Sequence, residues 1–266
     1  MGNNSSSKTR VNSLMANYVQ EDCKRFIDLL NLMNDGYRKD RWRDQDIGTI
    51  EAIYYDGSAL KEKSLAPTKS RLIWLIENLN QANAGRVLPE NKTTKKRNEL
   101  ISGEKRTVLE ATNNILAHDE TAGFPHKWWV LESNSQPDIF VQTDKFIFIG
   151  EAKQTENALT KSTNLDTDRI QMVRQIEGAM KYEQENYNGV NEREIISFYI
   201  LSDAFLNIDA NLDDLANSQS GDASMWDNSL KHLSRQSIKE IKETYLGFTT
   251  WEEIAETLSF NFDDAR

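Results

Sequence analysis

The sequence has little cysteine, proline or histidine: one cysteine (Cys23), four prolines and three histidines in 266 residues. A single cysteine excludes an internal disulfide. The scarcity of proline makes rigid linkers rare along the chain. The histidines are scattered without the spacing of metal ligands, so we expect no metal centre built on imidazole or thiolate groups.

Positive charge and long apolar runs are also lacking. The 32 basic residues are outnumbered by 42 acidic ones, which gives a formal net charge of −10. A protein that coats DNA is normally basic, so this balance argues against that class. No apolar run approaches the roughly 18 residues of a membrane span, and the N-terminal residues lack the apolar segment of a signal peptide. We therefore expect a soluble, cytoplasmic protein with no membrane partner.

The sequence does contain enough apolar residues for a buried core, because they make up 38% of the chain. The pattern of apolar and polar residues divides the chain into four stretches. They are a disordered tail over 1–12, a mostly helical region over 13–90, an α/β core over 91–203 and an acidic helical extension over 204–266. A short strand is expected at 49–55, inside the second stretch.

The core stretch alternates between helical and strand patterns. We expect a helix over 94–117, strands at 127–132, 138–142 and 145–153, a helix over 166–185 and an apolar strand at 194–201. Thr143-Asp144 is a tight connection, so the second and third of these strands form a hairpin. A meander followed by a crossover helix predicts a mixed central sheet with helices packed on it, an α/β fold.

The hairpin carries the residues on which chemistry can depend. Asp138 begins one arm and Glu151 ends the other, with twelve residues between them. Hairpin pairing brings the far ends of the two arms together, so these acids are expected to be neighbours. Glu151 and Lys153 are two apart on a strand and share a face. Two carboxylates at the end of a buried strand favour Mg²⁺ (or Mn²⁺) as their partner.

Pro137-Asp138, a spacer and then Glu151-Ala-Lys153 on a hairpin resembles the signature of the PD-(D/E)XK nuclease superfamily, whose fold is restriction endonuclease-like. The order helix, three strands, helix, strand (αβββαβ) over 94–203 resembles the core of that superfamily. The resemblance implies that Asp138 and Glu151 ligate a divalent metal and that Lys153 positions the attacking water.

Members of this superfamily often add a glutamate from the preceding helix as a further catalytic and metal-binding residue. The candidates on the helix expected over 94–117 are Glu99, Glu104 and Glu110. Glu104 follows Ile101 by three and precedes Val108 by four, so it would face the sheet, and it is our choice. Glu132, near the end of the first expected strand, is a weaker candidate for the same acidic cluster.

Basic residues are concentrated before the hairpin, although the whole chain is acidic. Residues 61–106 hold eleven basic and five acidic residues, whereas 203–266 hold five basic and thirteen acidic. Phosphate backbones are bound by such local positive charge, although an ordinary solvated surface is the alternative. The residues expected to contact nucleic acid are Lys92, Lys95, Lys96, Arg97 and Lys105, with Arg169 and Arg174 beside Gln171 and Gln175 on the crossover helix.

These features predict a Mg²⁺-dependent endodeoxyribonuclease of restriction or defence type with DNA as its partner. An RNA endonuclease on the same fold is one alternative, and a catalytically silent nucleic-acid-binding or scaffold module is another. Cutting both strands of a duplex ordinarily needs two active sites, so a homodimer is a further expectation.

Overall fold

The computed structural model describes residues 7–20, 24–35, 45–118, 127–154, 165–186, 192–206 and 225–262. Cys23, His126 and residues 1–6 of the expected tail lie outside these ranges. Residues 7–12 belong to helix α1 (Ser7–Leu14), so the expected tail does not extend through them. Among the described helices, none has the length and apolar character needed to cross a membrane.

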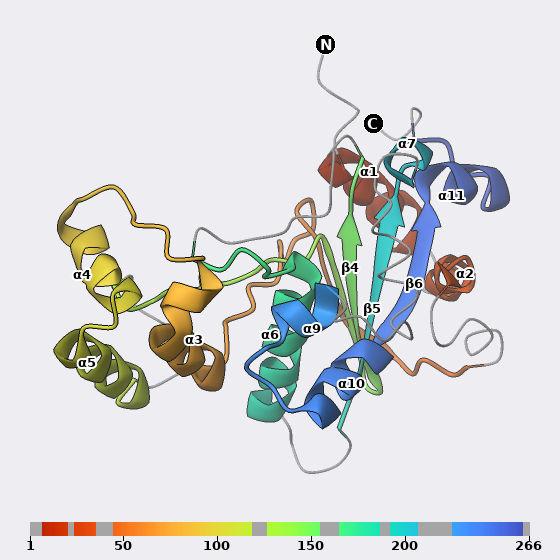
Figure 1. The fold of residues 1–266 in the computed structure, drawn as a ribbon. Coiled ribbons are helices and arrows are strands. Elements are labelled where there is room, and N and C mark those ends of the chain that lie inside the picture. The colour runs from red at the N-terminus through yellow and green to blue at the C-terminus, as the bar shows by residue number, and fades with distance from the viewer. Residues whose placement is uncertain are drawn as a thin grey trace.

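A six-stranded mixed sheet organises the chain into an α/β fold (Figure 1). In spatial order the strands are β1 (Asn34–Asp35), β6 (Tyr245–Thr250), β5 (Glu194–Leu201), β4 (Phe146–Ala152), β3 (Ile139–Thr143) and β2 (Ile50–Tyr54). Strands β2, β3 and β4 pair antiparallel, and β4, β5 and β6 pair parallel. The two-residue β1 forms the edge beside β6 and pairs with it antiparallel.

Helices cover both faces of the sheet, so its central strands are apolar on both sides. Phe146 and Phe148 of β4 face one apolar core, and Ile147 and Ile149 face the other. The first core is closed by α1, the π-helical turn η1 (Met15–Val19), α2 (Arg25–Asn31) and α11 (Trp251–Thr257). The second is closed by α6 (Gln171–Asn186), α9 (Met225–Ser229) and α10 (Arg235–Glu243), and the short α7 (Asp203–Leu206) follows β5.

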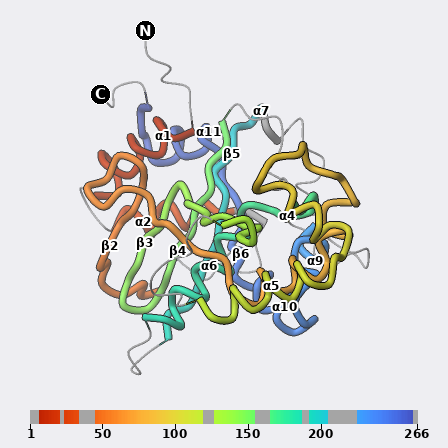
Figure 2. The backbone as a smooth tube through the Cα atoms, turned by 90° about the vertical axis from the view of Figure 1, so that its left-hand side faces the viewer, coloured from red at the N-terminus to blue at the C-terminus, as the bar shows by residue number. Residues whose placement is uncertain are grey.

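Three helices inserted between β2 and β3 form a separate lobe, which we call the three-helix lobe. It consists of α3 (Lys69–Ala82), α4 (Lys92–Ile101) and α5 (Lys105–Leu116). Figure 1 shows these helices together and away from the sheet, and Figure 2 shows the molecule from the side on which they lie. Their apolar faces enclose a third core together with Trp129 and Leu131. The segment that leaves this core runs directly to Asp138 and β3.

The structure corrects four expected elements. The helix expected over 94–117 is two helices, because the chain turns at 102–104, where Gly103 takes a φ of +73°. Residues 127–132 form a turn and irregular chain, and the outer strand of the meander is β2, inside the strand expected at 49–55. The crossover helix α6 begins at Gln171. The extension expected to be helical also contributes β6, which pairs with β5 inside the sheet.

Candidate active site

The hairpin of β3 and β4 brings Asp138 beside the end of β4, as its register predicts. Ile139 pairs with Gly150, and the Asp138 Oδ2 accepts a 2.9 Å hydrogen bond from the backbone N–H of Ala152. Lys153 Nζ lies 2.7 Å from Glu151 Oε1, since the two side chains project from the same face. The three residues predicted from the motif are therefore gathered at one end of the hairpin.

Elements distant in sequence hold the end of β4 in place. The Lys153 N–H donates to the Ile200 carbonyl at 2.8 Å, and its own carbonyl accepts a 3.1 Å hydrogen bond from Trp251 Nε1. On the other side, Gln175 Nε2 of α6 donates to Glu151 Oε2 at 2.8 Å. Both oxygens of Glu151 thus have fixed partners, which hold the carboxylate between Lys153 and Gln175.

A polar cavity of about 380 Å³ opens over these residues. Asp138, Glu151 and Lys153 line it together with Gln171 and Arg174 from α6. Ser133–Gln136, the segment arriving from the three-helix lobe, forms another wall. The cavity therefore lies where α1, the segment that follows the lobe, α6 and the carboxyl end of β4 meet. The carboxyl ends of strands are a common place for a ligand in an open α/β sheet.

Burial and mutual repulsion destabilise the charged forms of the two acids. Burial, reinforced by the charge of Asp138, raises the pKa of Glu151 to about 7 although Lys153 and Gln175 act in the opposite direction. Burial likewise raises the pKa of Asp138, against the hydrogen bond from Ala152 and the charge of Lys153. A cation between the carboxylates would relieve both effects.

The donor set fits a hard divalent cation with few protein ligands. Within the described ranges, no three His, Cys, Asp or Glu side chains are grouped closely enough to hold a metal. Asp138 and Glu151 supply two carboxylates, and Mg²⁺ commonly takes one or two, keeping several waters and binding substrate phosphate in the remaining positions. The residues present therefore suit Mg²⁺ or Mn²⁺ in the presence of a phosphate-bearing substrate.

Two further residues of the cavity, Lys8 and Glu62, were missed in the sequence. Lys8 Nζ of α1 donates to Glu62 Oε1 at 2.5 Å, and both charges act on Asp138. The loop with Glu62 is anchored nearby because Leu65 and Ser135 exchange two backbone hydrogen bonds of 2.8 Å. Lys8 stood in an expected tail and Glu62 in a charged run, so no local pattern could associate them with the hairpin.

Glu104 does not join the site. It is the N-cap of α5, where its carboxylate accepts a 2.6 Å hydrogen bond from the Thr107 N–H, and its side chain is exposed. The choice of Glu104 rested on a continuous helix over 94–117, and the turn at Gly103 removes that geometry. The other two candidates also stay in the lobe: Glu99 binds the Thr107 hydroxyl, and Glu110 pairs with Lys96.

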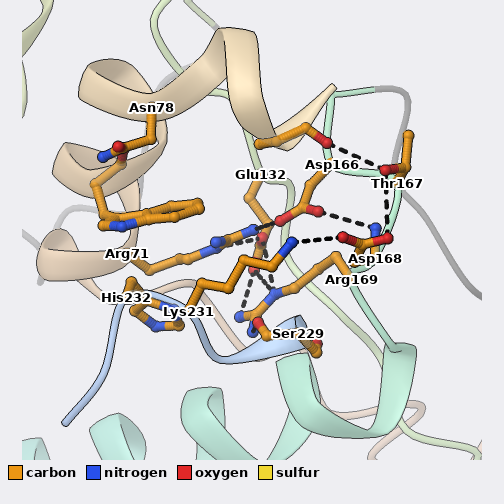
Figure 3. Close-up of polar contacts among 12 residues, drawn as sticks. Arg71, Asn78, Glu132, Asp166, Thr167, Asp168, Arg169, Ser229, Lys231 and His232 are labelled. Atoms are coloured by element: carbon orange, nitrogen blue, oxygen red, sulfur yellow. Dashed lines mark hydrogen bonds and ion pairs between the residues drawn. The ribbon is translucent and has the colours of Figure 1, made fainter. Parts of the chain in front are cut away.

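Arg169 and Glu132 form a buried charge network instead of contacting a ligand (Figure 3). Glu132 is 2% exposed and forms ion pairs of 3.0 Å with both Arg71 and Arg169. Arg169, 1% exposed, also pairs with Glu177 at 2.5 Å. The expectation that Arg169 contacts nucleic acid is therefore wrong, because its guanidinium is enclosed by carboxylates.

This network connects the three-helix lobe to helices α6 and α9. Arg71 comes from α3, Glu177 from α6, and Arg169 also donates to the Ser229 carbonyl at 3.0 Å. Burial alone would raise the pKa of Glu132, but Arg169 and Arg71 outweigh it and lower this pKa to about 2. The lobe is thus attached to the rest of the protein by fully charged, desolvated groups.

Of the remaining basic residues that were expected to contact nucleic acid, Arg174 lies at the cavity and the others lie on α4 and α5. Arg174 lines the cavity and donates to the Ser133 carbonyl at 2.8 Å, while its buried Nε makes no hydrogen bond to a described residue. Arg97, which was expected to contact nucleic acid, is half-buried and instead donates to the carbonyls of Trp128 and Val130, so it anchors α4. The other expected contacts, Lys92, Lys95, Lys96 and Lys105, lie on α4 and α5.

Comparison of the chain with protein-family models, with curated proteins and with solved structures finds no match.

Proposed function

We propose that the protein is a Mg²⁺-dependent endonuclease that hydrolyses DNA phosphodiester bonds at the Asp138–Glu151–Lys153 site. One observation carries the proposal: two partly or fully buried carboxylates and a lysine meet at the end of a hairpin, inside a polar cavity with an arginine in its wall. The same residues carry the resemblance to the PD-(D/E)XK superfamily. Helix α1, strands β2, β3 and β4, helix α6 and strand β5 occur in an αβββαβ order, which is interrupted by η1, α2 and β1 before β2 and by the three-helix lobe after it.

Each side chain has a separate role in the proposed reaction. Asp138 and Glu151 would hold the cation beside the scissile phosphate. Bound Mg²⁺ would supply a water of lowered pKa and stabilise negative charge on the phosphate. Lys153 would orient the attacking water. Its oxygen would bond to phosphorus as the bond to the 3′ oxygen breaks, and the 3′ oxygen would take up a proton, leaving a 5′-phosphate and a 3′-hydroxyl. Gln175 keeps Glu151 in position.

Positive charge at the mouth of the cavity supports a phosphate-bearing substrate. Arg174 lies in the wall beside the two acids, and Lys8 lies at its edge. Lys8 pairs with Glu62, and its side chain is 52% exposed. A guanidinium and an ammonium that line the same cavity as two carboxylates are suited to binding the phosphates that flank the scissile bond.

The test is cleavage of supercoiled plasmid, single-stranded DNA and RNA with Mg²⁺, with Mn²⁺ and with chelator. We expect nicked or linear plasmid only with metal. Asp138→Asn, Glu151→Gln and Lys153→Ala should each reduce the rate about 10²-fold or more. Asp28→Asn, a change in an exposed carboxylate of α2, is the matched control and should cleave as the wild type does.

Metal binding gives a readout that does not depend on turnover. Mg²⁺ should raise the Tm of the wild type and of Asp28→Asn, but not that of Asp138→Asn. Cleavage of RNA but not of DNA would show that the protein is an RNA endonuclease, which is the alternative on the same fold. Wild-type cleavage by Lys153→Ala and Asp138→Asn would refute the site, and a protein that neither binds Mg²⁺ nor cleaves any nucleic acid would be the silent module.

A further inference from the structure

Helices α4 and α5 are joined by a three-residue turn, Ser102-Gly103-Glu104. Gly103 takes a φ of +73°, a conformation that L side chains rarely adopt. Both helices pack on α3 around a shared apolar core. Two helices joined by a short glycine-containing turn are the arrangement of a helix-turn-helix, whose second helix enters the major groove of DNA.

The acidic groups of this pair are satisfied inside it. Lys96 forms ion pairs with Glu99 and Glu110, at 3.4 and 3.2 Å. Glu99 also accepts a 2.5 Å hydrogen bond from the Thr107 hydroxyl, which ties α4 to the first turn of α5. Glu104 is engaged as the N-cap of α5. These contacts fix the geometry of the pair, and the single positive charge of Lys96 offsets one of the two negative charges of Glu99 and Glu110.

Exposed basic residues of the pair are left without ion pairs. Within the part of the chain that the structure describes, Lys92, Lys95, Lys105 and Arg106 are exposed and form no salt bridge. Two of them lie on α4 and two in the first turn of α5. This is local positive charge on a protein whose net charge is −10, and a polyanion is the complementary partner.

One face of α5 carries the side-chain types that contact base edges. Arg106, Leu109, Asn113 and Leu116 are exposed and recur at helical spacing. The two leucines are 62% and 57% exposed, although α5 buries its opposite face in the lobe. Arginine pairs with guanine, asparagine with adenine, and apolar side chains contact the thymine methyl group.

We infer that the three-helix lobe is a helix-turn-helix module that reads duplex DNA, with α5 in the major groove and Lys92 and Lys95 of α4 on the phosphate backbone. The inference deepens the proposed function, on which it rests for the choice of substrate. The buried network between Arg71, Glu132 and Arg169 holds this module at a fixed position relative to the cavity. Reading and cleavage would therefore occur at a constant separation along the duplex.

The test is selection of a random duplex library by the wild-type protein in chelator, followed by affinity measurements on the enriched and a scrambled sequence. We expect an enriched sequence. Arg106→Ala and Asn113→Ala should weaken its binding about tenfold, and binding of the scrambled duplex much less. Lys92→Ala and Lys95→Ala should weaken the binding of both duplexes to a similar extent. Each should reduce the slope of log binding constant against log salt concentration by about one, the value for one lost phosphate contact.

Arg235→Ala is the matched control, because Arg235 is likewise an exposed arginine in the first turn of a helix, α10. It should leave both affinities unchanged, and circular dichroism melts should show that all variants are folded. Failure to enrich a sequence, or α5 variants that bind like Arg235→Ala, would overturn the inference. Tighter binding of RNA than of duplex DNA, if Arg106→Ala and Asn113→Ala abolish it, would also overturn the inference and would assign RNA as the partner of the lobe.

The two proposals fail separately. Sequence-dependent binding through α5 without any cleavage in Mg²⁺ would refute the nuclease and leave the module. Cleavage at unchanged positions by Arg106→Ala and Asn113→Ala would refute the module and leave the nuclease.

Discussion

Gln175 and Glu151 are 24 positions apart in the chain, and the Gln175 Nε2 donates a 2.8 Å hydrogen bond to the Glu151 Oε2. Both side chains are buried. Gln175 therefore acts on the proposed reaction through Glu151, as a positioning residue of α6. Lys153 binds the other carboxylate oxygen, so removing Gln175 leaves Glu151 held from one side only.

Gln175→Ala is expected to lower Mg²⁺-dependent cleavage by about 10–100-fold, the usual effect of removing a residue that orients a metal ligand. The loss should appear mainly as a higher Mg²⁺ concentration for half-maximal rate, which a purely structural defect would not produce. Gln184→Ala, in an exposed glutamine of the same helix, is the control and should titrate like the wild type.

Arg169→Ala is expected to destabilise the protein by about 3–5 kcal/mol, because it leaves Glu132 and Glu177 buried with a partner missing. Urea unfolding measures the change. Arg235→Ala, an exposed arginine, should alter the free energy of unfolding by less than about 0.5 kcal/mol. Equal stabilities for the two variants would mean that the buried network contributes nothing to the attachment of the lobe.

Acid should unfold the protein through Glu132. Its pKa is lowered from 4.5 to about 2 in the folded state, so its contribution to stability is present above pH 4.5 and is lost as the pH falls toward 2. The shift corresponds to a loss on the order of 3 kcal/mol. Unfolding free energies between pH 6 and pH 2.5 test this, and the Glu132→Gln variant should show a correspondingly weaker dependence on pH.

Gly150→Ala is expected to destabilise the hairpin that carries the site. A Cβ at this position would lie 2.7 Å from the ring of Phe198 and 3.0 Å from the Cβ of Ile139. Both neighbours are fully buried, so neither can move without disturbing the core. Overpacking of this kind costs about 1–3 kcal/mol. A Tm equal to that of the wild type would show that β4 and β5 can separate to accept a methyl group.

The adjacency of Asp138, Glu151 and Lys153 is determined by the sequence itself. A hairpin is a local structure, and a tight turn at Thr143-Asp144 between two apolar arms sets which residues lie opposite each other. The strand at 194–201 is similarly determined, since a continuous apolar run of that length can only be buried. These features need no knowledge of the rest of the chain.

Only the tertiary structure decided what surrounds the hairpin. Lys8 and Glu62 reach the cavity, and Gln175 reaches Glu151, from segments remote in sequence. Strand β6 enters the sheet from a stretch whose composition resembles surface helices. Glu104 was misplaced because a single left-handed glycine redirects the helical periodicity on which its assignment depended. Periodicity predicts which face of an element is buried, but the partner of that face is set by packing between distant segments.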